Sequence, residues 1–272
     1  MAPGPYAPEA RPDYPGRLRL DGRGYVVLGA GDGIGGAVCD AIAQAGGRVL
    51  CADLDGERAG RTAARCGGEA MTADVTDREQ LTAVFDRAGE LFGEGLHGIV
   101  DVVGVSFAEL LADGTEESMR RQFDLVLRHP VLLTQVAIPR LAALGHGSVV
   151  FIGSLAGAAN TPRLGLYGTA KAAVHHLATA CAQEFGPYGV RTNAVVVGRI
   201  LGSGGTPNPP AEAVRAVEAV VPQRRCGFPD DIASVVLFLL SDLAGYVNGA
   251  EIPVDGGIGV VSPLPSTHPA NR

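Results

Sequence analysis

The chain has 272 residues, of which 46% are hydrophobic and 39 are glycine, and it carries a formal net charge of −7. A chain of this length and composition buries a substantial core, which excludes an intrinsically disordered protein. The acidic balance and the absence of a dense Lys/Arg run exclude nucleic acid and anionic membrane surfaces as partners.

The N-terminal region shows neither a folded element nor a targeting signal. Residues 1–16 include five prolines and no apolar core, so we expect residues 1–19 to form an irregular arm. No segment reaches the roughly 18 to 20 apolar residues that a membrane helix needs. The five cysteines form no CxxC pair and no metal-ligand spacing. These features predict a cytoplasmic protein with reduced thiols and no metal site.

Short β-branched runs alternate with longer helical patterns along the rest of the chain. The expected strands are 25–28, 49–52, 70–73, 98–103, 148–152, 192–197 and 251–254. The expected helices are 34–45, 55–65, 77–92, 115–143, 164–185, 211–219 and 229–240. Central strands that are apolar almost throughout are typical of a parallel sheet covered on both faces. The alternation predicts a doubly wound α/β fold and a single domain over residues 20–260.

The first expected strand runs into a glycine-rich turn that opens a helix. Its glycines are Gly29, Gly31, Gly33 and Gly35. They let the backbone turn sharply and approach a pyrophosphate, while the N-terminus of the next helix presents free N–H groups. An ordinary glycine-rich turn is the less favoured interpretation.

The second expected strand ends at Asp53, at the spacing where an acidic side chain meets the adenosine ribose. A carboxylate there accepts hydrogen bonds from both ribose hydroxyls and repels a 2′-phosphate. Asp32, inside the glycine turn, adds a second negative charge. The two carboxylates therefore predict NAD(H) as the cofactor.

A second group of residues carries acid–base chemistry. Tyr167 and Lys171 are four residues apart and share one helix face, so the phenol and the ammonium can point into one cleft. A nearby ammonium favours the phenolate, and such a tyrosine exchanges a proton with a carbonyl or an alcohol. Ser154 ends an expected strand and can hydrogen-bond the same oxygen. A Tyr/Lys pair alone is more often only a helix surface.

These motifs, in this order and spacing, resemble the short-chain dehydrogenase/reductase family. The residues that carry the resemblance are the glycine turn, Asp53, the ADVTD segment at 73–77, Ser154, Tyr167 and Lys171. The similarity covers about residues 20–257 and ends in the segment YVNGAEIPVDGG. It implies a Rossmann-type fold, with a seven-stranded parallel sheet, helices on both faces, and a nicotinamide cofactor across the strand ends.

The resemblance also implies roles for individual residues. Tyr167 would be the general acid/base, Ser154 would orient the substrate oxygen, and Lys171 would bind the nicotinamide ribose and tune Tyr167. The implied cofactor-binding residues are Gly29, Gly31, Asp32, Gly33, Ile34, Gly35, Asp53, Leu54, Asp74, Val75, Val103, Gly104, Tyr167, Lys171, Gly198 and Ile200. Asp74 and Val75 match the pair that meets the adenine.

Two further regions follow from the resemblance. The segment 199–228, which includes the Gly/Pro-rich stretch GSGGTPNPP, looks like the family's mobile substrate lid. The expected helices 115–143 and 164–185 are apolar on more than one face, through Val131, Leu132, Val136, Val174, Leu177 and Ala178. In the family the second face packs on another subunit, so we expect a homotetramer, with a dimer as the alternative. Residues 261–272 form an expected irregular tail.

The chain departs from the family pattern in one neighbourhood. The threonine before the first glycine is Leu28, and the Asn-Asn-Ala-Gly motif reads Asp101-Val102-Val103-Gly104. The helix asparagine that supports a proton relay falls on Val126, and the Pro-Gly after strand six is Val197-Gly198. We expect Leu28 to touch residues 101–104, because in the family the threonine hydroxyl supports that loop. The departures from the family pattern at these positions therefore belong together. They weaken the expected activity more than the expected fold.

Two classes of function therefore stay open. The favoured hypothesis is an NAD(H)-dependent oxidoreductase that moves a hydride between the nicotinamide and a secondary alcohol or ketone. The alternative is an NAD(H)-binding protein with little or no turnover, acting as a redox sensor or assembly partner. Asp32 and Asp53 disfavour a third possibility, an NADPH-dependent acyl-carrier-protein reductase.

His175 lies one helical turn beyond Lys171, and two interpretations of it compete. No carboxylate partner is evident for it in the sequence, so we interpret it as a packing or interface residue. Cys39, on the helix after the glycine turn, is interpreted as a core residue.

Overall fold

Seven parallel strands form one sheet in the order β3-β2-β1-β4-β5-β6-β7 in the computed structural model, which describes residues 12–204 and 208–261. The strands are β1 (Gly24–Leu28), β2 (Arg48–Asp53), β3 (Glu69–Thr72), β4 (Leu96–Asp101), β5 (Gly147–Ile152), β6 (Val190–Val197) and β7 (Glu251–Val254). The strand order reverses between β1 and β4. Such a switch point leaves a crevice at the carboxyl ends of the strands, where α/β folds bind ligands.

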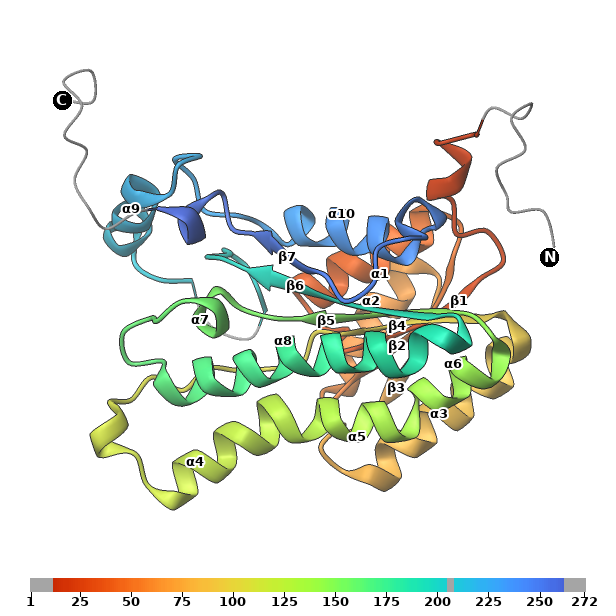
Figure 1. The fold of residues 1–272 in the computed structure, drawn as a ribbon, viewed down its shortest axis with the longest axis horizontal. Helices are drawn as coiled ribbons and strands as arrows, with labels where there is room; N and C mark the ends of the chain where they lie inside the picture. Colours follow the sequence, from red (N-terminus) through yellow and green to blue (C-terminus); the bar gives the residue numbers. More distant parts are fainter. Residues whose placement is uncertain (1–11, 205–207, 262–272) are drawn as a thin grey trace.

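Helices cover both faces of the sheet (Figure 1). They are α1 (Ile34–Gln44), α2 (Gly56–Cys66), α3 (Arg78–Phe92), α4 (Glu116–Phe123), α5 (His129–Val136), α6 (Ile138–Leu144), α7 (Leu155–Ala158), α8 (Gly165–Phe185), α9 (Ala211–Val220) and α10 (Pro229–Leu240). One core lies between the sheet and α3, α5, α6 and α8, the other between the sheet and α1, α2 and α10. Neighbouring strand residues belong to opposite cores, as Ile99 and Val100 of β4 do. The predicted Rossmann-type fold is confirmed.

The expected single helix over residues 115–143 is wrong. The structure divides it into α4, a π-helical segment at Asp124–Arg128, α5, and α6 after a break at Ala137. Pro130 and Pro139 lie at the starts of α5 and α6. A proline has no backbone N–H to donate to the preceding turn, which favours such interruptions. The consequence for the site is that Val126 lies fully buried inside the π-helical segment.

The terminal regions and the expected lid are only partly within the described residues. From the expected arm, Gly16–Leu18 forms a 3₁₀ turn, and Arg17 donates to the carbonyl of Asp242 at 2.9 Å. The expected lid is described at 199–204 and 208–228 and contains α9, whereas residues 1–11, 205–207 and 262–272 lie outside the described residues. Within the described ranges, no helix is long and apolar enough to cross a membrane.

Candidate active site

The glycine turn forms a cradle at the start of α1. Gly29 and Gly33 have positive φ angles of 77° and 88°, a backbone conformation that side chains with a Cβ rarely adopt. A Cβ on Gly35 would collide with the carbonyl of Gly29, so glycine lets α1 pack tightly on the turn. The N-cap of α1 is Gly33, and no side chain caps the helix. The N–H groups of the first turn are therefore available to an anion.

Asp53 lies against this cradle. One carboxylate oxygen accepts a hydrogen bond from the Gly31 N–H at 2.9 Å, and the other accepts one from the Asp55 N–H at 2.9 Å. Leu54, next in the chain, is exposed. The structure thus places the carboxylate beside the glycine turn, at the end of β2, as the sequence predicts.

The charge of Asp32 is not isolated. Its carboxylate pairs with Arg61 at 3.3 Å, and more than half of each side chain is exposed. The Arg58 side chain packs beside Gly31 and pairs with Asp55 at 3.0 Å. Two guanidinium groups thus stand near the two carboxylates that the sequence analysis used to predict the cofactor.

The expected adenine pair follows β3. Val75 is buried, whereas Asp74 is half-buried. One carboxylate oxygen of Asp74 accepts hydrogen bonds from the N–H and the hydroxyl of Thr76, at 2.9 and 2.6 Å. The side chain of Asp74 is therefore held within its own turn.

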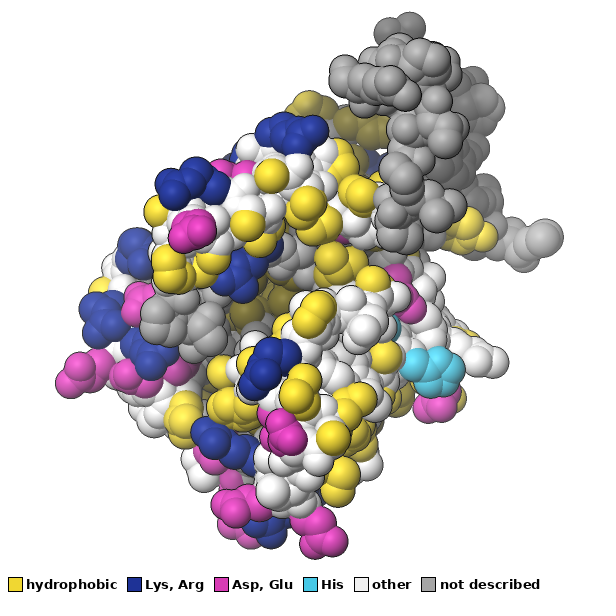
Figure 2. All heavy atoms as spheres, turned by 90° about the vertical axis from the view of Figure 1, so that its left-hand side faces the viewer, with side chains coloured by type: hydrophobic (Ala, Val, Ile, Leu, Met, Phe, Trp, Pro, Cys, Tyr) yellow, Lys and Arg dark blue, Asp and Glu magenta, His cyan; other side chains and the backbone are white. Residues whose placement is uncertain are grey.

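The three expected catalytic residues line one cavity of about 440 Å³ at the carboxyl ends of the strands. Figure 2 looks onto this face, which is hollowed near its middle. Of the expected cofactor residues, the same cavity is lined by Ile34, Gly104, Tyr167, Lys171, Gly198 and Ile200. The structure therefore brings Ser154, Tyr167 and Lys171 together although they come from the end of β5 and from α8.

Lys171 is almost fully buried, and its ammonium group is fixed by its surroundings. Its Nζ donates to the carbonyl of Ile152 at 2.7 Å and lies 6.0 Å from the centre of the Tyr167 ring. A Cβ on Gly104 would lie 3.1 Å from the same Nζ. An ammonium has three N–H donors, so two of them remain for other partners in the cavity.

Ser154 is held by both its backbone and its side chain. Its hydroxyl oxygen accepts a hydrogen bond from the Ala156 N–H at 3.2 Å, and its own N–H donates to Nε2 of His175 at 3.2 Å. His175 is buried, and its Nδ1 lies 3.5 Å from a carboxylate oxygen of Glu251 on β7. The interpretation of His175 as a packing residue missed this carboxylate, because 76 positions separate the two residues (251 − 175).

Burial lowers the pKa of His175, an effect that Glu251 opposes and Lys171 reinforces. The lowered pKa favours the neutral imidazole, which can accept the N–H of Ser154 at Nε2.

A buried acid–imidazole pair lies behind the site, and the sequence analysis did not single out its histidine. Nε2 of His129 lies 3.0 Å from both carboxylate oxygens of Asp101. The two side chains are 1% and 3% exposed. Because Asp101 is two residues after Ile99 along β4, the strand pattern places both on the same face of the sheet. Nothing in the sequence shows that residue 129 meets it there.

The lid approaches the glycine turn in this structure. A Cβ on Gly33 would collide with the backbone of Ser203, and a Cβ on Gly204 would collide with the carbonyl of Asp32. Ser203, Asn208 and residues of α9 also line the cavity that holds Tyr167. The described part of the lid therefore forms one wall of the site.

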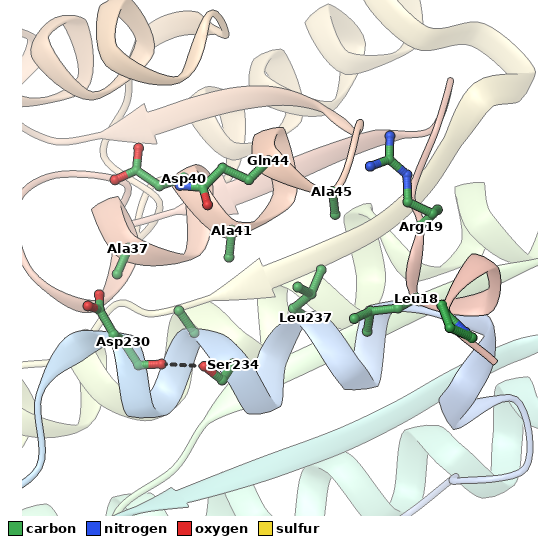
Figure 3. Close-up of a pocket in the computed structure, with 12 residues that line it drawn as sticks. Leu18, Arg19, Ala37, Asp40, Ala41, Gln44, Ala45, Asp230, Ser234 and Leu237 are labelled. Carbon is green, nitrogen blue, oxygen red and sulfur yellow. Dashed lines mark hydrogen bonds between the residues drawn. The ribbon is translucent and has the colours of Figure 1, made fainter.

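A second hollow, of about 600 Å³, lies outside this site between α1 and α10 (Figure 3). Ala37 and Ala41 of α1 face Ser234 and Leu237 of α10 across it. None of the expected catalytic residues lines it. The candidate active site is therefore the cavity at the carboxyl ends of the strands, which the expected catalytic residues line.

A Rossmann-type fold with a glycine cradle and a Ser–Tyr–Lys set in one cavity defines a class of nucleotide-dependent oxidoreductases. Comparison with known proteins agrees with this class. A family model described as Enoyl-(Acyl carrier protein) reductase matches residues 29–259. The chain belongs to the short-chain dehydrogenase/reductase family.

Individual relatives are similar over most of their length. Protein FixR of Bradyrhizobium diazoefficiens is 36% identical over 248 residues, with 85% of each chain covered. The (3R)-3-hydroxyacyl-CoA dehydrogenase of Rattus norvegicus is 31% identical over 255 residues, covering 89% of this chain and 98% of the relative. A solved 7 alpha-hydroxysteroid dehydrogenase, complexed with NADH and 7-oxo glycochenodeoxycholic acid, has a TM-score of 0.84 at 29% identity and covers 89% and 96% of the two chains.

Proposed function

We propose that this protein is an NAD(H)-dependent oxidoreductase that interconverts a secondary alcohol and a ketone. The observation that carries the proposal is that Ser154, Tyr167 and Lys171 line one cavity, which adjoins the glycine cradle at Ile34. The hydroxysteroid and hydroxyacyl-CoA dehydrogenases among the relatives act, by their names, on hydroxyl groups, which supports this class of reaction.

The residues of the cradle fit a dinucleotide. The uncapped N-terminus of α1 and the positive φ angles of Gly29 and Gly33 fit a pyrophosphate held close to the backbone. Asp74 and Val75 would meet the adenine, and Val103, Gly198 and Ile200 would meet the nicotinamide half. The bound cofactor would supply or accept the hydride.

Asp53 is the basis for proposing NAD(H) rather than NADP(H). Its carboxylate stands at the end of β2, where the adenosine ribose would lie, and it would oppose a 2′-phosphate. The pairing of Asp32 with Arg61 leaves Asp53 as the main source of that opposition. The same carboxylate argues against an NADPH-dependent acyl-carrier-protein reductase.

The catalytic residues would act as hydrogen-bond donors and as a proton donor or acceptor toward the substrate and the cofactor. The Ser154 hydroxyl already accepts a hydrogen bond, so its own hydrogen can be donated to a substrate oxygen. Tyr167 would exchange a proton with that oxygen. Lys171, anchored to the carbonyl of Ile152, would bind the nicotinamide ribose and stabilise the phenolate.

The cavity lining indicates the kind of substrate to test. Most of the lining beyond the catalytic residues is apolar, with Val105, Leu155, Leu164 and Val217, and Arg199 lies among the lining residues. We therefore propose small secondary alcohols or ketones with an apolar body, tested with and without an anionic group.

One observation favours a second candidate function. Val126 is buried and apolar at the position where the family carries the asparagine of a proton relay. An NAD(H)-binding protein with little turnover, acting as a redox sensor or assembly partner, would need no relay. The name of the relative FixR states no reaction.

We further propose that the protein forms a homotetramer, with a dimer as the alternative. Of the apolar residues expected on two faces, Leu132, Val174 and Ala178 are buried in the core. Val131, Val136 and Leu177 are half-buried. Val136 and Leu177 pack partly against the same core, and the exposed parts of the three side chains are available for contact with a second copy. Light scattering at micromolar concentration should give the mass of four or two chains, and the mass of one chain would contradict the proposal.

A reducing, cytoplasmic location also belongs to this proposal. The five cysteines are free thiols in the structure. The sulfur of Cys51 lies 3.6 Å from that of Cys39 and 3.9 Å from that of Cys66, and no disulfide bond joins them. Free thiols this close together suit a compartment that keeps them reduced.

The test of the proposed activity is a panel of secondary alcohols and ketones offered with NAD(H) and with NADP(H). Turnover is followed by nicotinamide absorbance, with the cofactor but no substrate as the control. We expect turnover of at least one member with NAD(H). Tight NADH binding without turnover of any member would favour the sensor function.

A further inference from the structure

Asp101 and His129 form a carboxylate–imidazole pair in which both side chains are almost fully buried. In every other acid–base pair in residues 12–204 and 208–261, at least one side chain is 40% or more exposed. Nδ1 of His129 is buried and has no hydrogen-bond partner in that part of the chain. The carboxylate of Asp101 is therefore the polar contact that holds this imidazole.

The pair joins two elements at the edge of the active site. Asp101 is the last residue of β4, and His129 is the first residue of α5, directly after the π-helical segment. The same carboxylate accepts a hydrogen bond from the N–H of Val103 at 3.2 Å. Asp101 thus connects the start of α5 to the backbone of the segment that follows β4.

That segment, residues 102–104, forms a wall of the cavity. Val102 and Gly104 line it, and Gly104 faces the ammonium of Lys171. A Cβ on Gly29 would lie 3.1 Å from Cγ2 of Val103, so the segment also abuts the glycine turn. A small displacement of residues 102–104 would move the wall that faces both groups.

Stability alone does not account for such a pair. Replacing a buried ion pair by well-packed apolar side chains is often neutral or stabilising, whereas removing one partner is costly. An apolar pair would fill the space between β4 and α5. It would not offer an acceptor to the N–H of Val103, and that N–H would lose its fixed direction.

We propose that Asp101 and His129 are positioning residues that hold segment 102–104 against the nicotinamide half of the bound cofactor. This inference rests on the proposed NAD(H) function. The adenine half would meet residues from β2 and β3, and β1 separates those strands from β4 in the sheet. The pair therefore stands on the nicotinamide side of the sheet, and Val103 is its contact with the glycine turn.

The test compares binding of NADH with binding of ADP-ribose, which lacks only the nicotinamide ring and keeps both riboses, together with thermal stability. The comparison therefore isolates the contact of the segment with the ring. The variants are Asp101→Leu, His129→Leu, the double variant Asp101→Leu/His129→Leu, and Asp101→Asn. Asp101→Asn keeps one acceptor oxygen for Val103. Asp86→Asn, which breaks the surface pair with Arg140, is the matched control.

We expect Asp101→Leu to weaken NADH binding about tenfold, as the loss of one well-formed hydrogen bond would, and to leave ADP-ribose binding within about twofold. The double variant should recover thermal stability relative to the single leucine variants but not NADH affinity. Asp101→Asn should retain most of the affinity for NADH, and Asp86→Asn should change the affinity for neither ligand. If the single leucine variants do not fold, Asp101→Asn and the double variant carry the same comparison.

Two results would overturn the inference while leaving the proposed function intact. One is a parallel loss of NADH and ADP-ribose binding, and the other is recovery of NADH affinity in the double variant. Failure of the unaltered protein to bind either ligand would instead overturn the proposed function, and this inference with it.

Discussion

The cofactor cradle and the segment after β4 lie at the same end of the sheet but are built on different principles. The cradle works through backbone geometry, with the positive φ angles of Gly29 and Gly33 and an uncapped helix N-terminus. The segment after β4 is held by two side chains, Asp101 and His129, from elements 28 positions apart. The glycines of the cradle follow the family pattern, whereas Leu28 before them and residues 101–104 depart from it. We therefore expect substitutions in the two regions to affect cofactor binding and turnover differently.

The largest expected effect comes from removing the acid/base group, Tyr167, whose cavity lies between the two regions. Its loss should lower turnover and leave cofactor binding in the cradle unchanged. Tyr167→Phe keeps the aromatic ring but removes the proton, so turnover should fall by about 10² or more while NADH binding is retained. Tyr188→Phe, at an exposed tyrosine, is the matched control. Steady-state rates and binding titrations measure both effects. A Tyr167→Phe variant with most of its activity left would show that the catalytic assignment is wrong.

The next effect concerns the cradle. Asp53→Asn keeps an acceptor for the Gly31 N–H but removes the charge that opposes a 2′-phosphate. The preference for NADH over NADPH should shrink by about tenfold, since hydrogen bonds to charged groups contribute roughly 1.5–3 kcal/mol. Asp53→Ala should narrow or reverse the preference. Titration of the unaltered protein is the control, and tighter binding of NADPH than of NADH to it would reject the cofactor assignment.

A smaller effect is expected in the π-helical segment. Val126→Asn introduces a polar side chain where the family supports a proton relay, so turnover should rise, or at least persist, provided that water enters beside it. Without water, the buried amide would cost about 1–3 kcal/mol of stability. Rates and thermal melts of the variant distinguish these cases. Abolished turnover in a folded variant would contradict the expectation.

How far the sequence could predict the molecule differs between the same two regions. Apolar strands that alternate with helical patterns predicted the sheet, and the glycine turn and Asp53 predicted the cradle. Both signals are contained in short stretches of the chain, so they can be recognised in the sequence. The π-helical segment before Pro130 and the break at Ala137 before Pro139 were missed because the apolar pattern continues through both prolines. Long-range pairing of side chains leaves no local pattern, so His129 beside Asp101 could not be predicted.

The smallest expected effect concerns the histidine behind Ser154. Burial lowers the pKa of His175 below its usual 6.5, so the unfolded chain binds a proton more readily than the folded one. The folded protein therefore loses stability as the pH falls below about 6.5. The His175→Gln variant has no imidazole to titrate at this position, so its stability should fall less over the same pH range. We expect a difference of about 1–3 °C in the pH-induced change in melting temperature between pH 7 and 5. His176→Gln, at the exposed neighbour, should behave like the unaltered protein, and an unchanged pH dependence in His175→Gln would contradict the assignment.

Hydride transfer itself tests the central claim most directly. NADH carrying deuterium at the transferred position is incubated with a panel of ketones, and the alcohol products are examined by mass spectrometry. The account predicts that at least one product gains one deuterium at the carbinol carbon with the unaltered protein, and that the gain is lost with Tyr167→Phe. Bound NADH with no deuterium in any product would contradict the assignment of this site as an alcohol–ketone oxidoreductase.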